Sequence, residues 1–167
     1  MFLLNSQQKS HEKNRHSLIG LRSIRRHRNL KEFDAAEFDA LLFPGGSGAV
    51  KNLSDFAFKG AAMKVNAAVE KAIRSMHAAG KPIGALCIAP VLLAKVIAGC
   101  NVTIGNDEDT ATHIEQMSSH HSNTNATGIV IDKKNKLVTT PCYMLGTRIS
   151  EIYEGAGKVV GALMKMM

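Results

Sequence analysis

The sequence predicts an α/β fold in which a mostly parallel sheet lies between two layers of helices. Short, continuously apolar segments alternate along the chain with longer segments whose apolar residues recur at helical spacing. The chain has 167 residues, of which 45% are hydrophobic and 21% charged, and this is the composition of a single globular domain. Because no apolar run approaches the roughly 18 residues of a membrane span, we expect no membrane partner.

The first predicted strand is the apolar run of residues 38–43, which stops at the glycine-rich loop of residues 44–48. A helix follows, because apolar residues recur at helical spacing over residues 65–76. Asn66 lies near the start of this helix and Gly80 lies just beyond its end, which are the positions these residue types prefer.

Residues 83–86 form a second apolar strand, and a helix beginning at Pro90 extends to about Ile97. Residues 101–104 predict a third strand, and a short helix capped by Asp109 or Thr110 follows it. This repeated alternation of strand and helix is the pattern of a parallel sheet covered by helices on both faces.

The carboxyl-terminal part of the chain predicts a hairpin and a long helix. Residues 128–132 and 136–140 flank a short polar turn, which favours two paired strands. From Thr147 to Leu163 apolar residues recur at helical spacing, so this helix should cover one face of the sheet.

The net charge of +7 belongs to an amino-terminal segment, residues 1–31, which we call the basic arm. The arm holds eight Lys or Arg residues and one acidic residue, and residues 32–167 are neutral overall. A block of like charge is typical of a solvated, irregular segment, so we divide the chain into this arm and one domain, residues 32–167. Contact with nucleic acid or anionic lipid, or organelle targeting, is the alternative for the arm, although two Tyr and no Trp argue against base stacking.

Cys87 stands at the junction of a predicted strand and a predicted helix, among small residues. A tight turn there would direct its side chain out above the sheet edge, as in a nucleophile elbow, and the helix start would favour the thiolate. The glycine-rich loop ends the neighbouring strand, so the N–H groups of Gly46 and Ile88 can form an oxyanion hole beside the cysteine. The alternative is a small buried residue, the usual role of a free cysteine.

The other cysteines and histidines give little indication of a site. Three cysteines do not make a disulfide scaffold, which favours a reducing, cytoplasmic compartment. His120 and His121 are adjacent, and adjacent side chains point apart on a strand or helix. His113, Cys100 and Cys142 have no ligand spacing either, so we predict no metal site.

Three segments together resemble a known family: residues 38–54 (FDALLFPGGSGAVKNLS), 80–90 (GKPIGALCIAP) and 138–145 (VTTPCYML). They are similar to the ElbB branch of the class I glutamine-amidotransferase-like, PfpI-like superfamily, over about four fifths of the chain. The resemblance implies a flavodoxin-like three-layer α/β/α sandwich with Cys87 on the elbow. Bacterial members are described as isoprenoid-biosynthesis or glyoxalase proteins, and eukaryotic relatives are mitochondrial, so a mitochondrial location is the alternative.

The sequence departs from this family at two places. Members begin with a strand-helix unit that brings an acidic residue to the cysteine, and we expect this unit to be lacking. The strand at residues 38–43 would then lie at a sheet edge, which predicts marginal stability or self-association as a homodimer. Glutaminases pair the nucleophile with His on a late loop, and residues 139–144 hold no His, which argues against glutaminase activity. His121 matches a histidine of relatives and is a candidate proton shuttle or a structural residue.

Two functions from different classes follow from the resemblance. The first is a cofactor-independent, glyoxalase-type lyase in which Cys87 converts small dicarbonyls to 2-hydroxy acids. The second is a non-catalytic, redox-sensing or partner-binding member, or a truncated paralogue, that kept the fold.

Overall fold

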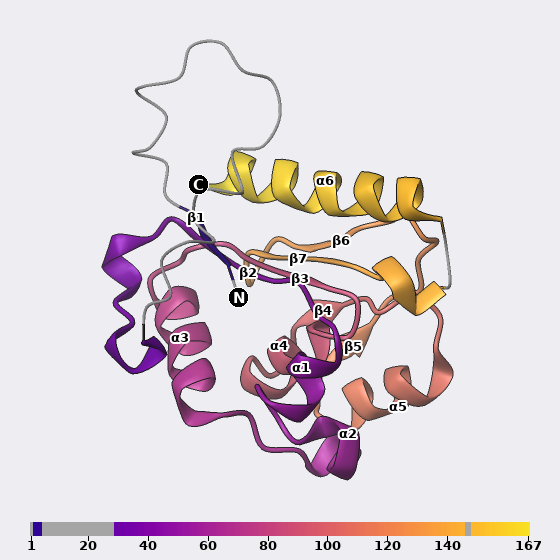
Figure 1. Cartoon of the computed structure of the whole chain (residues 1–167), viewed down its shortest axis with the longest axis horizontal. Coiled ribbons are helices and arrows are strands. Elements are labelled where there is room, and N and C mark those ends of the chain that lie inside the picture. Colours follow the sequence, from indigo (N-terminus) through magenta and orange to yellow (C-terminus); the bar gives the residue numbers. More distant parts are fainter. Residues whose placement is uncertain (1, 5–28, 146–147) are drawn as a thin grey trace.

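The computed structural model of the chain describes residues 2–4, 29–145 and 148–167. These residues form three layers, with helix α6 on one face of a central sheet and α3 and α4 on the opposite face (Figure 1). The predicted fold class is therefore confirmed. The helices are α1 (Ser47–Lys51), α2 (Phe56–Lys59), α3 (Ala67–Ala78), α4 (Pro90–Val96), α5 (Glu108–Gln116) and α6 (Ile149–Met166), and the strands are β1 (Phe2–Leu4), β2 (Ala40–Phe43), β3 (Ile83–Leu86), β4 (Asn101–Val102), β5 (His120–His121), β6 (Val130–Asp132) and β7 (Leu137–Thr140).

The central sheet has the strand order β1-β2-β3-β7-β6. Its three middle strands, β2, β3 and β7, run parallel, whereas β1 and β6 pair antiparallel at the two edges. Leu41, Ile83 and Leu137 occupy one register across the parallel strands and face the core beneath α3 and α4. The carboxyl ends of β2, β3 and β7 thus meet at one edge of the sheet, where sites form in such folds.

Helix α6 packs closely on the other face because β3 carries a glycine there. A β-carbon on Gly84 would lie 2.8 Å from Leu163 Cδ1 and 3.2 Å from Val159 Cγ1. Both α6 side chains are fully buried, together with Leu42 and Val138 of the sheet. Burial of each such side chain contributes about 1.5–3 kcal/mol to folding, so this contact between α6 and the sheet holds the carboxyl-terminal helix in place.

Most predicted elements form where local signals place them. Asn66 caps α3 by accepting a hydrogen bond from Ala68 N–H at 3.0 Å, and α4 begins at Pro90. Two details differ. Helix α5 is capped by Asp107, which accepts from Thr110 N–H at 2.8 Å, rather than by Asp109 or Thr110. Helix α1 begins at Ser47, inside the stretch that we predicted to be wholly a loop.

The predicted third strand lies outside the central sheet. Only Asn101 and Val102 form β4, which pairs in parallel with β5 as a separate two-stranded sheet. Toward the central sheet, side chains rather than the strand backbone accept the N–H groups of Asn101 and of Thr103, the residue after β4. Asn101 N–H donates to Asp132 Oδ2 and Thr103 N–H donates to Thr139 Oγ1, both at 2.9 Å.

The amino-terminal arm corrects one expectation. Phe2–Leu4, which we predicted to be irregular, form β1 on the outer side of β2, so β2 is not a sheet edge. A short apolar run can add a strand to an open edge because that edge offers unpaired backbone groups. The rest of the predicted irregular arm, residues 5–28, lies outside the described residues. In the part of the chain that the structure describes, no helix combines the length and apolar character that a membrane crossing requires.

Candidate active site

Cys87 has the backbone geometry of a nucleophile elbow. It follows β3 directly and adopts φ 58°, a left-handed conformation that non-glycine residues rarely adopt. Its N–H donates to Thr140 O, and Ala89 N–H closes the turn on Leu86 O, both at 3.0 Å. The side chain is half-buried, and α4 begins three residues later. A strained strand-turn-helix of this kind exposes a reactive side chain at the end of a sheet.

The glycine-rich loop presses against this elbow. Gly45 has φ 88°, and a β-carbon built on it would lie 2.5 Å from Leu86 O and 2.8 Å from Cys87 Cβ. No real side chain tolerates such distances, so only glycine lets the loop after β2 approach the cysteine. The two predicted parts of the site, loop and cysteine, are therefore neighbours.

The two N–H groups predicted to form the oxyanion hole have no acceptor among the described residues. Among the described residues, neither Gly46 N–H nor Ile88 N–H donates a hydrogen bond to a protein acceptor. Gly46 has φ 79° and is exposed, and Ile88 is half-buried directly after Cys87. Unpaired backbone N–H groups of this kind can hold an anion, although their role here stays a prediction.

A second cysteine lies at the site, and the sequence analysis did not place it there. Cys142 is 4% exposed and follows β7, the strand paired with β3. Burial and the neighbouring Cys87 thiol raise the pKa of Cys142 to about 11, and the Cys87 N–H partly opposes that shift. Like Cys87, Cys142 adopts a left-handed conformation, with φ 46°. The signal for this proximity is the strand order, because β3 and β7 are far apart in the sequence.

Cys100 lies in the core and not at the elbow. It is fully buried, and its thiol donates to Ser119 Oγ at 3.6 Å. Burial raises the pKa of Cys100 to about 11. Cys100 is therefore neither accessible to a substrate nor present mainly as the reactive thiolate.

His121 has a structural partner. Its Nε2 accepts a hydrogen bond from Ile104 N–H at 3.2 Å, so the imidazole supports the turn after β4. Burial lowers the pKa of His121, and the Glu115 and Asp107 carboxylates partly oppose that shift. Within the described residues no hydrogen bond joins His121 to Cys87, and its role as a proton shuttle stays a prediction.

The other predicted histidine and cysteine positions do not converge. His113 packs edge-on against Phe56, and His120 is exposed on β5. Over residues 2–4, 29–145 and 148–167, no three His, Cys, Asp or Glu side chains gather where they could hold a metal ion.

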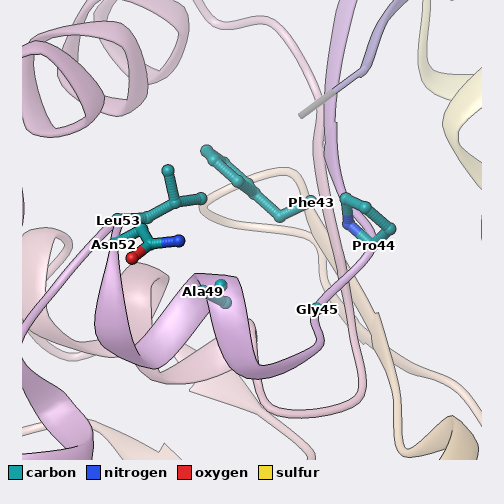
Figure 2. A pocket seen from close by; sticks show the side chains of 7 residues that line it. Phe43, Pro44, Gly45, Ala49, Asn52 and Leu53 are labelled. Atoms are coloured by element: carbon teal, nitrogen blue, oxygen red, sulfur yellow. The ribbon is translucent and has the colours of Figure 1, made fainter.

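A small hollow lies beside the glycine-rich loop. Its volume is about 220 Å³, and Gly45 contributes to its wall as well as to the contact with Cys87. Figure 2 shows Phe43 and Pro44 on one side and Ala49, Asn52 and Leu53, from α1 and the residues after it, on the other. Asn52 brings a polar amide to a lining that is otherwise apolar side chain and glycine backbone.

Comparisons with known proteins agree with this geometry. Residues 8–142 match the DJ-1/PfpI family. The ES1 protein homolog, mitochondrial, of Rattus norvegicus and the glutamine amidotransferase-like class 1 domain-containing protein 3, mitochondrial, of Homo sapiens are each 42% identical over 147 residues, covering 83% of this chain and 55% of the relative. The crystal structure of an isoprenoid biosynthesis protein with an amidotransferase-like domain from Ehrlichia chaffeensis is 28% identical, with a TM-score of 0.73 over 83% of this chain and 64% of that one. The chain thus spans about half the length of the curated relatives it matches.

Proposed function

The chain belongs to the DJ-1/PfpI family, and on that premise we propose that it is a glyoxalase-type enzyme with Cys87 as its nucleophile. The observation that carries the proposal is the left-handed Cys87 at the end of β3, with Gly45 pressed against it. We further propose that the chain belongs to the ElbB branch. The likeness to the Ehrlichia protein, whose name combines isoprenoid biosynthesis with an amidotransferase-like domain, supports that placement.

The proposed substrate is a small dicarbonyl such as methylglyoxal. The Cys87 thiolate adds to the aldehyde carbon, and the carbonyl oxygen becomes an oxyanion that the Gly46 and Ile88 N–H groups hold. A proton then moves from the aldehyde carbon to the adjacent carbonyl carbon, which gives a thioester of the 2-hydroxy acid. Water hydrolyses this thioester and releases the thiol. Methylglyoxal and water give lactate, so the balance needs no external oxidant, reductant or cofactor.

The hollow of about 220 Å³ adjoins the elbow through Gly45, and Cys87 itself does not line it. Its volume is below the roughly 300–1,000 Å³ of pockets that hold drug-sized ligands. The Asn52 amide in its wall can bond the carbonyl or hydroxyl oxygens of a dicarbonyl. Glutaminase activity is not proposed, because residues 139–144 hold no histidine to serve as base.

The test is turnover of methylglyoxal, followed as lactate formed, by the purified chain and two alanine variants. Cys87→Ala should lose turnover because the nucleophile is gone. Cys100→Ala is the matched control, since it removes a buried cysteine in the core, and should retain turnover. Turnover that survives in Cys87→Ala would show that another site, or amine chemistry of Lys and Arg, carries the reaction.

A non-catalytic, redox-sensing or partner-binding role is the second candidate. It is favoured by the lack, among the described residues, of a histidine hydrogen-bonded to Cys87. If the wild-type chain turns over no dicarbonyl while Cys87 still reacts with iodoacetamide, this candidate replaces the first.

We also propose a mitochondrial location and a homo-oligomer. Both curated relatives are mitochondrial proteins, and they lend no support to the cytoplasmic expectation. Helix α6 leaves Ile149 and Tyr153 at 76% and 79% exposure, and large exposed apolar side chains favour association with a second copy. Sedimentation of the wild type and of Tyr153→Glu tests this, because a monomeric wild type would contradict the proposal.

A further inference from the structure

Cys87 and Cys142 are placed as a pair by the topology of the sheet. Cys87 is the first residue after β3 and Cys142 is the second after β7, and these parallel strands are neighbours. The register pairs Leu86 with Thr140, so the two cysteines are offset by one residue across the strand ends. Neighbouring strands lie about 4.8 Å apart, and both cysteines lie within two residues of the paired strand ends, which is compatible with the roughly 4.4–6.8 Å between Cα atoms that a disulfide spans.

The two cysteines share a backbone conformation and a packing environment. Both adopt left-handed backbone conformations, with φ 58° for Cys87 and 46° for Cys142. Both pack against one cluster of buried residues that includes Leu86 and Val138. In agreement with this placement, Cys87 contributes to the raised pKa of Cys142.

We propose that Cys142 is the resolving thiol of Cys87, and that the pair reduces hydroperoxides by forming a Cys87–Cys142 disulfide. The inference rests on the proposed function only for the reactivity of Cys87, and it does not require dicarbonyl turnover. Cys100 is excluded as the partner because it lies in the core before β4, where its thiol bonds Ser119.

The reaction balances in two steps. The Cys87 thiolate attacks one oxygen of a hydroperoxide ROOH and breaks the O–O bond, which gives Cys87 sulfenic acid and, after protonation of the leaving oxygen, the alcohol ROH. The Cys142 sulfur then attacks the Cys87 sulfur, an S–S bond forms, and the sulfenic oxygen leaves as water. The peroxide gains two electrons and the two thiols lose them. A low-molecular-weight thiol returns the pair to the reduced state by exchange.

The burial of Cys142 suits this role. At 4% exposure the residue meets few solution oxidants directly, so the first oxidation falls on the half-buried Cys87. The resolving step is intramolecular and needs no solvent access to Cys142. A disulfide also prevents further oxidation of Cys87 to the irreversible sulfinic acid.

The experiment exposes the reduced chain to limiting hydrogen peroxide, blocks free thiols with iodoacetamide and maps peptides by mass spectrometry. The expected result in the wild type and in Cys100→Ala is a linked Cys87–Cys142 peptide that dithiothreitol removes. Cys142→Ala should lose the linked peptide and accumulate Cys87 sulfinic acid, while dimedone traps its sulfenic acid.

Two results would overturn the inference: a wild type that forms sulfinic acid on Cys87 without a linked peptide, or a disulfide that includes Cys100. If circular dichroism shows that Cys142→Ala is unfolded, the wild-type peptide map alone decides. Methylglyoxal turnover, measured on the same reduced samples, separates this inference from the proposed function. A missing disulfide with intact turnover refutes the inference alone, and a disulfide without turnover refutes only the glyoxalase.

Discussion

Replacing Gly45 with alanine should disrupt the elbow, and Gly46 supplies a matched control. Both glycines have left-handed backbones, with φ 88° and 79°. A β-carbon on Gly45 would lie 2.5 Å from Leu86 O, whereas a β-carbon on Gly46 meets nothing within 4 Å. Both substitutions place an alanine at a positive φ that L residues rarely adopt, and only Gly45→Ala adds a clash.

The distances set the expected size of the effect. Ordinary contact begins near 3.4 Å, so the Leu86 carbonyl and the new methyl group must separate by about 0.9 Å. A left-handed alanine costs about 1–2 kcal/mol, and forcing an extra methyl group into a packed site costs about 1–3 kcal/mol. We expect Gly45→Ala to lower the free energy of unfolding by about 2–5 kcal/mol, and Gly46→Ala by about 1–3 kcal/mol from its backbone conformation alone.

Urea unfolding of the wild type and both variants, followed by circular dichroism, measures the difference. The reasoning concerns the contact between loop and elbow, so the comparison between variants matters more than either value. Equal destabilisation by the two substitutions would show that the loop does not press on Cys87, and the site as described would be wrong.

Three further predictions concern other groups. Burial raises the pKa of Cys100 and of Cys142 from 9.0 to about 11, so the thiolate fraction of each at pH 8 falls about 100-fold. Labelling with iodoacetamide, followed by mass spectrometry, should therefore find Cys87 modified first. Faster labelling of either buried thiol would contradict the assignment of Cys87 to the elbow. Asp132→Asn should lower the free energy of unfolding, measured with urea, by about 1–3 kcal/mol, because an amide cannot accept from all three donors that now bond the carboxylate. An unchanged urea midpoint would refute this prediction. Burial lowers the pKa of His121 below 6.5, so on acidification the unfolded chain takes up the proton first, and the stability that neutral His121 provides is lost as the pH falls from 6.5. The urea midpoint of the wild type should therefore fall more on acidification than that of His121→Gln. Parallel pH profiles of the two midpoints would contradict this prediction.

Local signals in the sequence were sufficient where neighbouring residues decide the structure. The Asn66 cap, the Pro90 helix start and the apolar run of β3 act within a few residues, and each formed as predicted. The position of β4 beside the central sheet, rather than in it, depends instead on distant side chains. Asp132 and Thr139 take up its N–H groups, and no feature of the residues around β4 indicates this.

The same distinction applies to the candidate site. Cys87 could be singled out because its strand, turn and helix are contiguous in the sequence. Its contact with Cys142 depends on β7 lying beside β3, which is a property of strand order and not of spacing. Similarly, the strand at Phe2–Leu4 was missed because the charge of the arm outweighs the three apolar residues of that strand, and the pairing partner lies far along the chain at β2.

The attachment of β4 through side chains has a consequence for how this fold can evolve. Residues 101–121, with β4, α5 and β5, contribute no rung to the ladder of the central sheet. An insertion between β5 and β6 would therefore shift no pairing among β2, β3 and β7, which carry the elbow. The unit is held by the Asp132 and Thr139 side chains and by its own buried Val102, Ile104 and Ile114, so changes confined to its loops leave the strand pairing beneath Cys87 in register.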